Sequence, residues 1–227
     1  MGIKEKYQII RKKIPDDVTI VLAAKKRTAD EVAEAIDAGA TDIGENYVQE
    51  AQKMYEHLGK KAKIVRWHLI GSLQKNKINT ALPIFDVIQT VGDFSIAEGI
   101  DKRVEKAGKK VIPVYIEINI GSEITKYGIK PEYKSILDLI KKISGNLEHL
   151  KVEGLMTMGP RFGDPEESRL YFKKTKEIFD EIKMLDLPNV SMKALSMGMS
   201  NSYRVAIEEG SNMVRLGTIV FGEREYK

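Results

Sequence analysis

Strand-like and helix-like stretches alternate along this 227-residue chain, and that alternation limits the folds open to it. Short apolar runs bounded by turn residues indicate strands, and apolar residues at three- and four-residue spacing indicate helices. The predicted strands lie at residues 19–24, 42–44, 64–70, 87–90, 111–118, 152–157, 191–196 and 213–216. The predicted helices lie at residues 4–13, 29–38, 47–58, a short stretch from 73, 95–107, 131–144, 165–184 and 202–209.

This order predicts an α/β protein built on a parallel sheet with right-handed crossovers. Eight such repeats close into a (β/α)₈ TIM barrel. An open doubly wound sheet is the alternative, but no Gly-x-Gly-x-x-Gly motif follows an early strand and no Walker motif occurs. Because no linker or low-complexity segment interrupts the pattern, we expect one barrel domain over residues 1–227.

The first strand carries the clearest chemical signal. Residues 18–24 are almost wholly apolar, which is typical of a strand buried on both faces, and Lys25 follows directly. Binding sites of this fold class form at the carboxyl ends of the strands, so Lys25 is a candidate amine nucleophile for Schiff-base chemistry. A solvated lysine that ends the strand explains this segment equally well.

Two later segments have the composition of an anion site. Ser196 to Ser200 follows the seventh predicted strand, Gly217-Thr218 follows the eighth, and both place hydroxyl groups beside glycines. Glycine lets backbone N–H groups approach an anion closely, and the loops after strands seven and eight commonly hold phosphate in barrels.

Three further polar residues belong to the predicted barrel mouth or interior. Arg215 lies two residues before Gly217 and so points to the same side of its strand, toward a ligand or into a salt bridge with a carboxylate such as Glu45. Asn46 is interpreted first as a turn residue and second as a ligand contact. His68 is expected to be a hydrogen-bonded residue of the barrel interior.

Composition narrows the function classes. The absence of cysteine excludes disulfides and thiolate catalysis, and the three histidines are too scattered for a metal site. The net charge of +4 is mild and the charges are interspersed, so we expect no nucleic-acid partner, although anionic small molecules remain plausible. The N-terminus lacks a signal peptide and no run is long enough to span a membrane, which predicts a cytoplasmic protein with no membrane partner.

Several motifs in order along nearly the whole chain resemble one known family. They are residues 24–25 (AK), 44–50 (GENYVQE), 67–77 (WHLIGSLQKNK), 154–158 (GLMTM), 195–200 (LSMGMS) and 214–218 (VRLGT). The set resembles the pyridoxal phosphate homeostasis protein family, which is similar in fold to the N-terminal barrel of alanine racemase.

That resemblance implies a site for pyridoxal 5′-phosphate. Lys25 would form an aldimine with the cofactor, Arg215 would face its pyridine nitrogen, and Asn46 would lie against its ring. The phosphate would be held at the last two loops, with either serine as its main contact; the residues implied there are Ser196, Met197, Ser200, Gly217 and Thr218. No catalytic residue and no metal ligand is implied.

The expected function is binding of pyridoxal phosphate and its buffering or delivery to apo-enzymes that use it, without efficient catalysis. An arginine at the pyridine nitrogen disfavours protonation of the ring and so weakens carbanion stabilisation. The sequence ends at Tyr226-Lys227, soon after the eighth repeat, and we expect no second domain to supply a catalytic tyrosine. The alternatives are a low-activity amino-acid racemase and a Schiff-base enzyme acting on a sugar phosphate; we expect a monomer or weak dimer.

Overall fold

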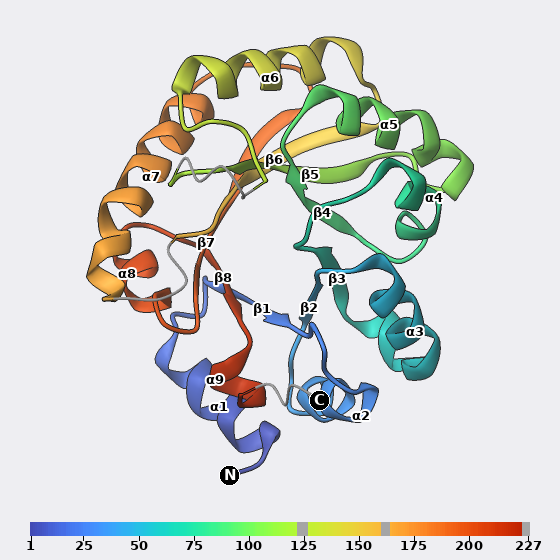
Figure 1. The fold of residues 1–227 in the computed structure, drawn as a ribbon, viewed down its shortest axis with the longest axis vertical. Coiled ribbons are helices and arrows are strands. Elements are labelled where there is room, and N and C mark those ends of the chain that lie inside the picture. The colour runs from blue at the N-terminus through green and yellow to red at the C-terminus, as the bar shows by residue number, and fades with distance from the viewer. Residues whose placement is uncertain (122–126, 160–163, 224–227) are drawn as a thin grey trace.

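The computed structural model describes residues 1–121, 127–159 and 164–223, in which eight parallel strands form a closed barrel (Figure 1). The strands are β1 (Thr19–Ala23), β2 (Asp42–Glu45), β3 (Arg66–Leu69), β4 (Val87–Val91), β5 (Ile112–Ile118), β6 (Leu150–Thr157), β7 (Val190–Met199) and β8 (Met213–Leu216). Each strand pairs with the next in the sequence, and β8 pairs with β1 to complete the ring. The predicted TIM barrel is therefore confirmed.

Helices surround the barrel on its outside (Figure 1). They are α1 (Ile3–Lys13), α2 (Ala29–Asp37), α3 (Val48–Leu58), α4 (Ile78–Ala81), α5 (Phe94–Val104), α6 (Tyr133–Asn146), α7 (Arg169–Lys183), α8 (Tyr203–Glu208) and α9 (Thr218–Phe221). Four short 3₁₀ turns lie at Lys61–Ile64, Lys75–Lys77, Glu105–Ala107 and Pro165–Ser168. No helix in these described ranges is long and apolar enough to cross a bilayer.

The start of α2 shows how local sequence places an element. Thr28 Oγ1 accepts a hydrogen bond from Glu31 N at 3.2 Å, and a Glu31 carboxylate oxygen accepts one from Thr28 N at 2.7 Å. This reciprocal capping box satisfies two N–H groups that the helix itself cannot pair. It fixes the chain direction directly after the segment that carries Lys25.

Element boundaries differ from the sequence prediction in ways that matter for the site. β7 extends to Met199, so Ser196 lies inside a strand rather than in the loop after it. The pairing of β7 with β8 shifts between Ser196 and Met199, and such an irregularity is not visible in an apolar pattern. The short helix α9 was also not predicted, and Tyr226 and Lys227 lie outside the described residues.

Two apolar cores result from the alternation of side chains along the strands. The outer core fills the space between the barrel and the helices, and the inner core fills the barrel itself. The inner core consists of Val21, Ile70, Val87, Tyr115, Met156, Ala194 and Met213, with Ala23 and Met158 packed against it. These positions identify which residues of each strand face inward.

Gly154 of β6 provides a test of the barrel packing. A Cβ atom at Gly154 would lie 2.1 Å from the backbone oxygen of Ala194 on β7, so Gly154→Ala forces the two strands apart. We expect the free energy of unfolding in urea to fall by about 1–3 kcal/mol. The matched control is Gly145→Ala in α6, where a Cβ meets nothing within 4 Å. Helix propensity predicts a gain of about 0.5–1 kcal/mol there; equal effects of the two variants would contradict the packing described.

Candidate functional site

Lys25 emerges from β1 on the inner side of the barrel. Val21 and Ala23 belong to the inner core and Ala24 to the outer one, so the alternation brings Lys25 inward at the carboxyl end of the strand. The side chain is half-buried, and its Nζ lies 4.8 Å from the centre of the Tyr47 ring. Lys25 therefore presents its amine at the rim of the barrel mouth.

The two basic residues after Lys25 take other directions. Lys26 has a left-handed backbone conformation with φ of 59°, and its N–H donates to Glu50 at 3.2 Å. Arg27 donates to the carbonyl oxygen of Phe221 at 3.3 Å and to that of Gly222, so it holds the end of α9. The turn thus separates Lys25 from its basic neighbours.

Arg215 points from β8 into the barrel interior, where it is only 4% exposed. Its guanidinium donates to the carbonyl oxygen of Ser196 at 2.9 Å, to Ser196 Oγ at 2.8 Å and to the carbonyl oxygen of Thr157 at 2.8 Å. Burial lowers the pKa of Arg215 to about 10, which leaves it charged at neutral pH. Its hydrogen-bond partners are these neutral groups, so the salt bridge to Glu45 considered from the sequence is absent.

Three further residues, Gln89, His68 and Asp42, extend the contact between Arg215 and Ser196 across the barrel. Ser196 Oγ donates to Gln89 Oε1 at 2.7 Å, and Gln89 Nε2 lies 2.9 Å from His68 Nδ1. His68 Nε2 lies 2.8 Å from Asp42 Oδ1. Because an amide nitrogen donates, His68 Nδ1 accepts and its Nε2 carries the proton toward Asp42. We call Asp42, His68, Gln89, Ser196 and Arg215 the interior chain.

The interior chain confirms the expectation for His68, which is fully buried and hydrogen-bonded on both nitrogens. Burial lowers the pKa of His68, and Asp42 opposes that effect only in part. A neutral imidazole matches the hydrogen-bond directions just given. Each polar link therefore runs in one direction, from the guanidinium of Arg215 to the carboxylate of Asp42.

Glu117 is a second buried carboxyl group in the barrel interior. It lies two residues beyond Tyr115 on β5, on the same inner side, and is 3% exposed. Burial raises its pKa to about 7, while the charge of Arg215 acts in the opposite direction. Its Oε2 has no hydrogen-bond partner among the described residues. The sequence analysis missed Glu117, although its spacing from Tyr115 on a predicted strand would have placed it inside.

The loops after β7 and β8 meet through Ser200. Ser200 Oγ accepts hydrogen bonds from Gly217 N at 3.1 Å and from Ile219 N at 3.4 Å, at the start of α9. With both lone pairs engaged, the hydroxyl group of Ser200 can still act as a donor. Gly217 passes close to β1, since a Cβ there would lie 3.4 Å from the Ala23 carbonyl oxygen. Ser200, Gly217 and exposed Thr218 thus lie on the strand-end side that also carries Lys25.

The other two residues expected at the anion site have buried side chains. Ser196 is fully buried in the interior chain, and the Met197 side chain belongs to the outer core. Gly198 then takes a φ of 92°, and a Cβ there would lie 2.5 Å from Ala206, so only glycine fits. The sequence left open which serine is the main phosphate contact. Ser200 lies partly exposed in the loop, whereas Ser196 is buried and hydrogen-bonded to Arg215.

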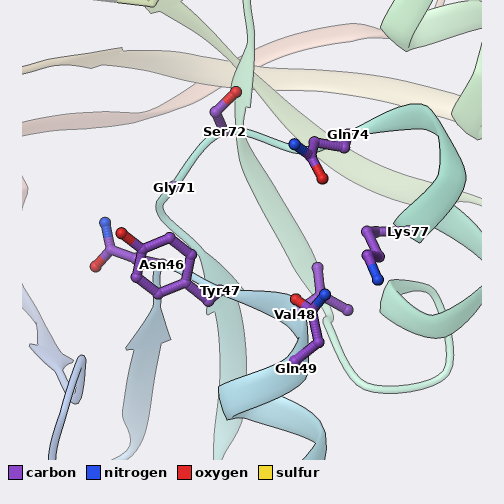
Figure 2. Close-up of a pocket in the computed structure, with 8 residues that line it drawn as sticks. All are labelled: Asn46, Tyr47, Val48, Gln49, Gly71, Ser72, Gln74 and Lys77. Carbon is purple, nitrogen blue, oxygen red and sulfur yellow. The ribbon is translucent and has the colours of Figure 1, made fainter.

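Asn46 lines a side pocket of about 500 Å³ beside the mouth, shown in Figure 2. The eight residues that line it are Asn46, Tyr47, Val48, Gln49, Gly71, Ser72, Gln74 and Lys77. The N-cap residue of α3 is Tyr47, so Asn46 precedes the helix as the turn interpretation expected.

A second cavity, of about 360 Å³, lies outside the barrel beside α2 and α3. Glu45 lines it together with Lys26, Arg27 and Glu50. Burial, followed by the charge of Glu50, raises the pKa of Glu45 to about 8. No group of three or more histidine or acidic residues suited to a metal ion occurs in the described ranges.

Gln89 is the central link of the interior chain, and its replacement tests that chain. Gln89→Leu leaves His68 Nδ1 and the Ser196 hydroxyl without their buried partner. We expect the free energy of unfolding to fall by about 1–3 kcal/mol. The control Gln52→Leu removes an exposed amide that donates to Glu56 on the surface of α3 and should change the free energy of unfolding by less than about 0.5 kcal/mol. Equal free energies of unfolding for Gln89→Leu and the wild type would contradict the hydrogen bonds of the interior chain.

Glu117 predicts a pH dependence of stability. The pKa of Glu117 is about 7 in the folded protein against an ordinary value of 4.5, so between these pH values the folded state retains a proton that the unfolded state loses. The free energy of unfolding contributed by Glu117 therefore falls as pH rises from 4.5 to 7. Glu117→Gln removes this slope, and at pH 8 the variant should exceed the wild type by about 1–3 kcal/mol in urea unfolding. If the free energies of unfolding of the two proteins change in parallel from about pH 5 to pH 8, Glu117 is not buried as described.

Known proteins share both this sequence and this fold. The family model of the alanine racemase N-terminal domain matches residues 2–225. The pyridoxal phosphate homeostasis protein of Aquifex aeolicus is 41% identical over 91% of this chain and 87% of that protein. That of Escherichia coli K12 is 33% identical over 93% of this chain and 88% of its own length.

Solved structures agree with these matches. PipY of Synechococcus elongatus, with pyridoxal phosphate bound, superimposes with a TM-score of 0.86 at 28% identity, covering 97% of this chain and all of that one. An alanine racemase of Clostridium difficile shares the fold with a TM-score of 0.78 at 17% identity, and this chain corresponds to 57% of its length. The chain therefore belongs to the pyridoxal phosphate homeostasis protein family, built on the barrel of the alanine racemase N-terminal domain.

Proposed function

We propose that this protein binds pyridoxal 5′-phosphate in the barrel mouth, reversibly and covalently through Lys25, and holds it for cytoplasmic enzymes that require it. The observation that carries the proposal is the position of Lys25, half-buried on the inner side of β1 within one barrel mouth that also contains Arg215 and Ser200. When bound, the cofactor supplies an aldehyde that reacts with a primary amine, a pyridine ring and a phosphate group.

The described side chains suit each part of that group. The Ser200 hydroxyl would donate to the phosphate, with Gly217 and Thr218 beside it. Arg215 would face the ring from below, and Asn46 would approach it from the rim. The unpartnered Oε2 of Glu117 leaves a buried polar atom in the interior that a bound polar group would satisfy.

Arg215 supports binding in preference to catalysis. A guanidinium has five N–H donors and no acceptor, so it cannot accept a hydrogen bond from a protonated ring nitrogen. Hydrogen bonds to Ser196 and Thr157 fix the position of Arg215, and its pKa of about 10 keeps it charged at neutral pH. Arg215 therefore disfavours the protonated ring on which efficient carbanion chemistry depends. The names of the relatives, which call them homeostasis proteins, support the same assignment.

Ser196 and Met197 act indirectly in this proposal. Ser196 positions Arg215 through its carbonyl oxygen and its hydroxyl group, both within 2.9 Å of the guanidinium. The Met197 side chain anchors β7 in the outer core and so fixes the loop that contains Ser200. Neither side chain needs to touch the phosphate for the site to form.

The test is to identify the lysine that carries the cofactor. Purified protein incubated with pyridoxal phosphate should gain a visible absorption band, and borohydride followed by peptide mass mapping should place the added mass on Lys25. Lys25→Ala should lose both signals, whereas the matched control Lys26→Ala, which changes the exposed neighbour, should retain them.

Two results would contradict the proposal. One is mass added to another lysine, with Lys25→Ala still coloured. The other is steady-state racemisation of alanine or serine that disappears in Lys25→Ala, since this would identify an enzyme. Transfer of the bound cofactor to an apo-enzyme, without such turnover, is the expected result.

A further inference from the structure

The side pocket brings together two sequence motifs that the proposed cofactor site does not use in full. Residues 46–49 supply one wall from the start of α3, and Gly71, Ser72, Gln74 and Lys77 supply the other from the segment after β3. Figure 2 shows the two groups facing each other across the pocket. Its volume of about 500 Å³ falls in the range of small-molecule sites.

The walls of the pocket are fixed by backbone contacts. A Cβ at Gly71 would lie 2.3 Å from the Asn46 carbonyl oxygen, so only glycine allows the two segments to approach this closely. Thr90 Oγ1 donates to the Gly71 carbonyl oxygen at 2.9 Å, and Ile70 N donates to that of Glu45 at 2.9 Å. The pocket therefore exists before any ligand arrives.

Its charge and polarity define the class of ligand. Lys77 is the charged residue of the lining, and no carboxylate is present there. Lys77 is half-buried, and its amine has no hydrogen bond or ion pair with any residue the structure describes. Three amides and two hydroxyl groups complete the polar lining, in Asn46, Gln49, Gln74, Tyr47 and Ser72. A small molecule with one carboxylate and a second polar group matches this set.

Tyr47 connects the pocket to Lys25. The Tyr47 ring lines the pocket and also lies 4.8 Å from Lys25 Nζ. A ligand whose carboxylate lies at Lys77 thus extends toward Asn46 and Tyr47, at the rim where Lys25 emerges. Asn46 and Ser72 offer oxygen acceptors for an ammonium group.

We infer that the side pocket is a binding site for a small α-amino acid, with its carboxylate at Lys77 and its amino group toward Asn46 and Tyr47. A bound amino acid would hold an amine near Tyr47, the residue that connects the pocket to Lys25, so that the amine could compete with that lysine for the cofactor. That consequence rests on the proposed function. Binding of the amino acid itself does not, because the pocket is formed by the chain alone.

The test is an amide NMR titration of the full-length, cofactor-free protein with L-alanine. The amide signals of Gly71, Ser72 and Gln74 should shift in a saturable manner, and L-alaninamide, which lacks the carboxylate, should bind at least about tenfold more weakly. Lys77→Gln should weaken L-alanine binding by about tenfold or more, and Lys77→Arg should restore most of it.

The matched control is Lys75→Gln. Lys75 lies in the same 3₁₀ turn and is exposed, and its amine donates to Ser95 Oγ outside the pocket lining. Lys75→Gln removes one positive charge, as Lys77→Gln does, so an unchanged affinity of Lys75→Gln for L-alanine supports a specific contact at Lys77. Equal losses in the two variants would reduce the effect to net charge and overturn the inference.

Two further outcomes would overturn it. One is saturation by inorganic phosphate on the same amides with no response to L-alanine, which would identify a phosphate site. The other is the absence of any shift up to high L-alanine concentration. Failure of Lys25 to take the cofactor, with L-alanine binding intact, would refute only the proposed function.

Discussion

The pairing of β8 with β1 is the contact on which the rest of the site depends. It closes the barrel with Val21 opposite Arg215 and Leu22 opposite Leu216. Because parallel strands end at the same rim, this register brings Gly217 next to Ala23 and so brings the loop that carries Lys25 and the loop after β8 to the same rim, although they are far apart in the sequence. If the pairing of β8 with β1 slipped by one residue, the inward-facing side chains of one strand would turn outward. The Lys25 amine would then be separated from the loop that contains Gly217 and Thr218.

The interior chain explains how a permanent charge is tolerated inside the barrel. An isolated buried guanidinium is strongly disfavoured, so its donors need fixed acceptors. Ser196 and Thr157 provide them, and Gln89 and His68 continue the hydrogen bonds to Asp42. Such a fully bonded network is rigid, because each member loses its partners if another moves. Arg215 is consequently held in one orientation inside the barrel.

The sequence predicted the barrel because its two periodicities are strong, and it placed Lys25 because one apolar strand leads directly to it. It placed Ser196 less well. The register of β7 against β8 shifts between Ser196 and Met199, where methionines alternate with serine and glycine, and a hydrophobic pattern alone does not reveal a bulge. Gln89 was missed because a polar residue in a buried strand has meaning only once its cross-barrel partners, here Ser196 and His68, are known. Glu117 was missed although its spacing from Tyr115 on the predicted strand places it inside. The side pocket depends on the close approach of Gly71 to Asn46, which no spacing along the chain encodes.

The central claim is that one amine and one anion-binding loop serve the same bound molecule. A crystal structure of the protein grown with pyridoxal 5′-phosphate measures this most directly. We predict continuous electron density from Lys25 Nζ to the cofactor, with the phosphate against Ser200, Gly217 and Thr218 and the ring above Arg215. Cofactor density attached to a different lysine, or a phosphate bound away from the start of α9, would contradict the account.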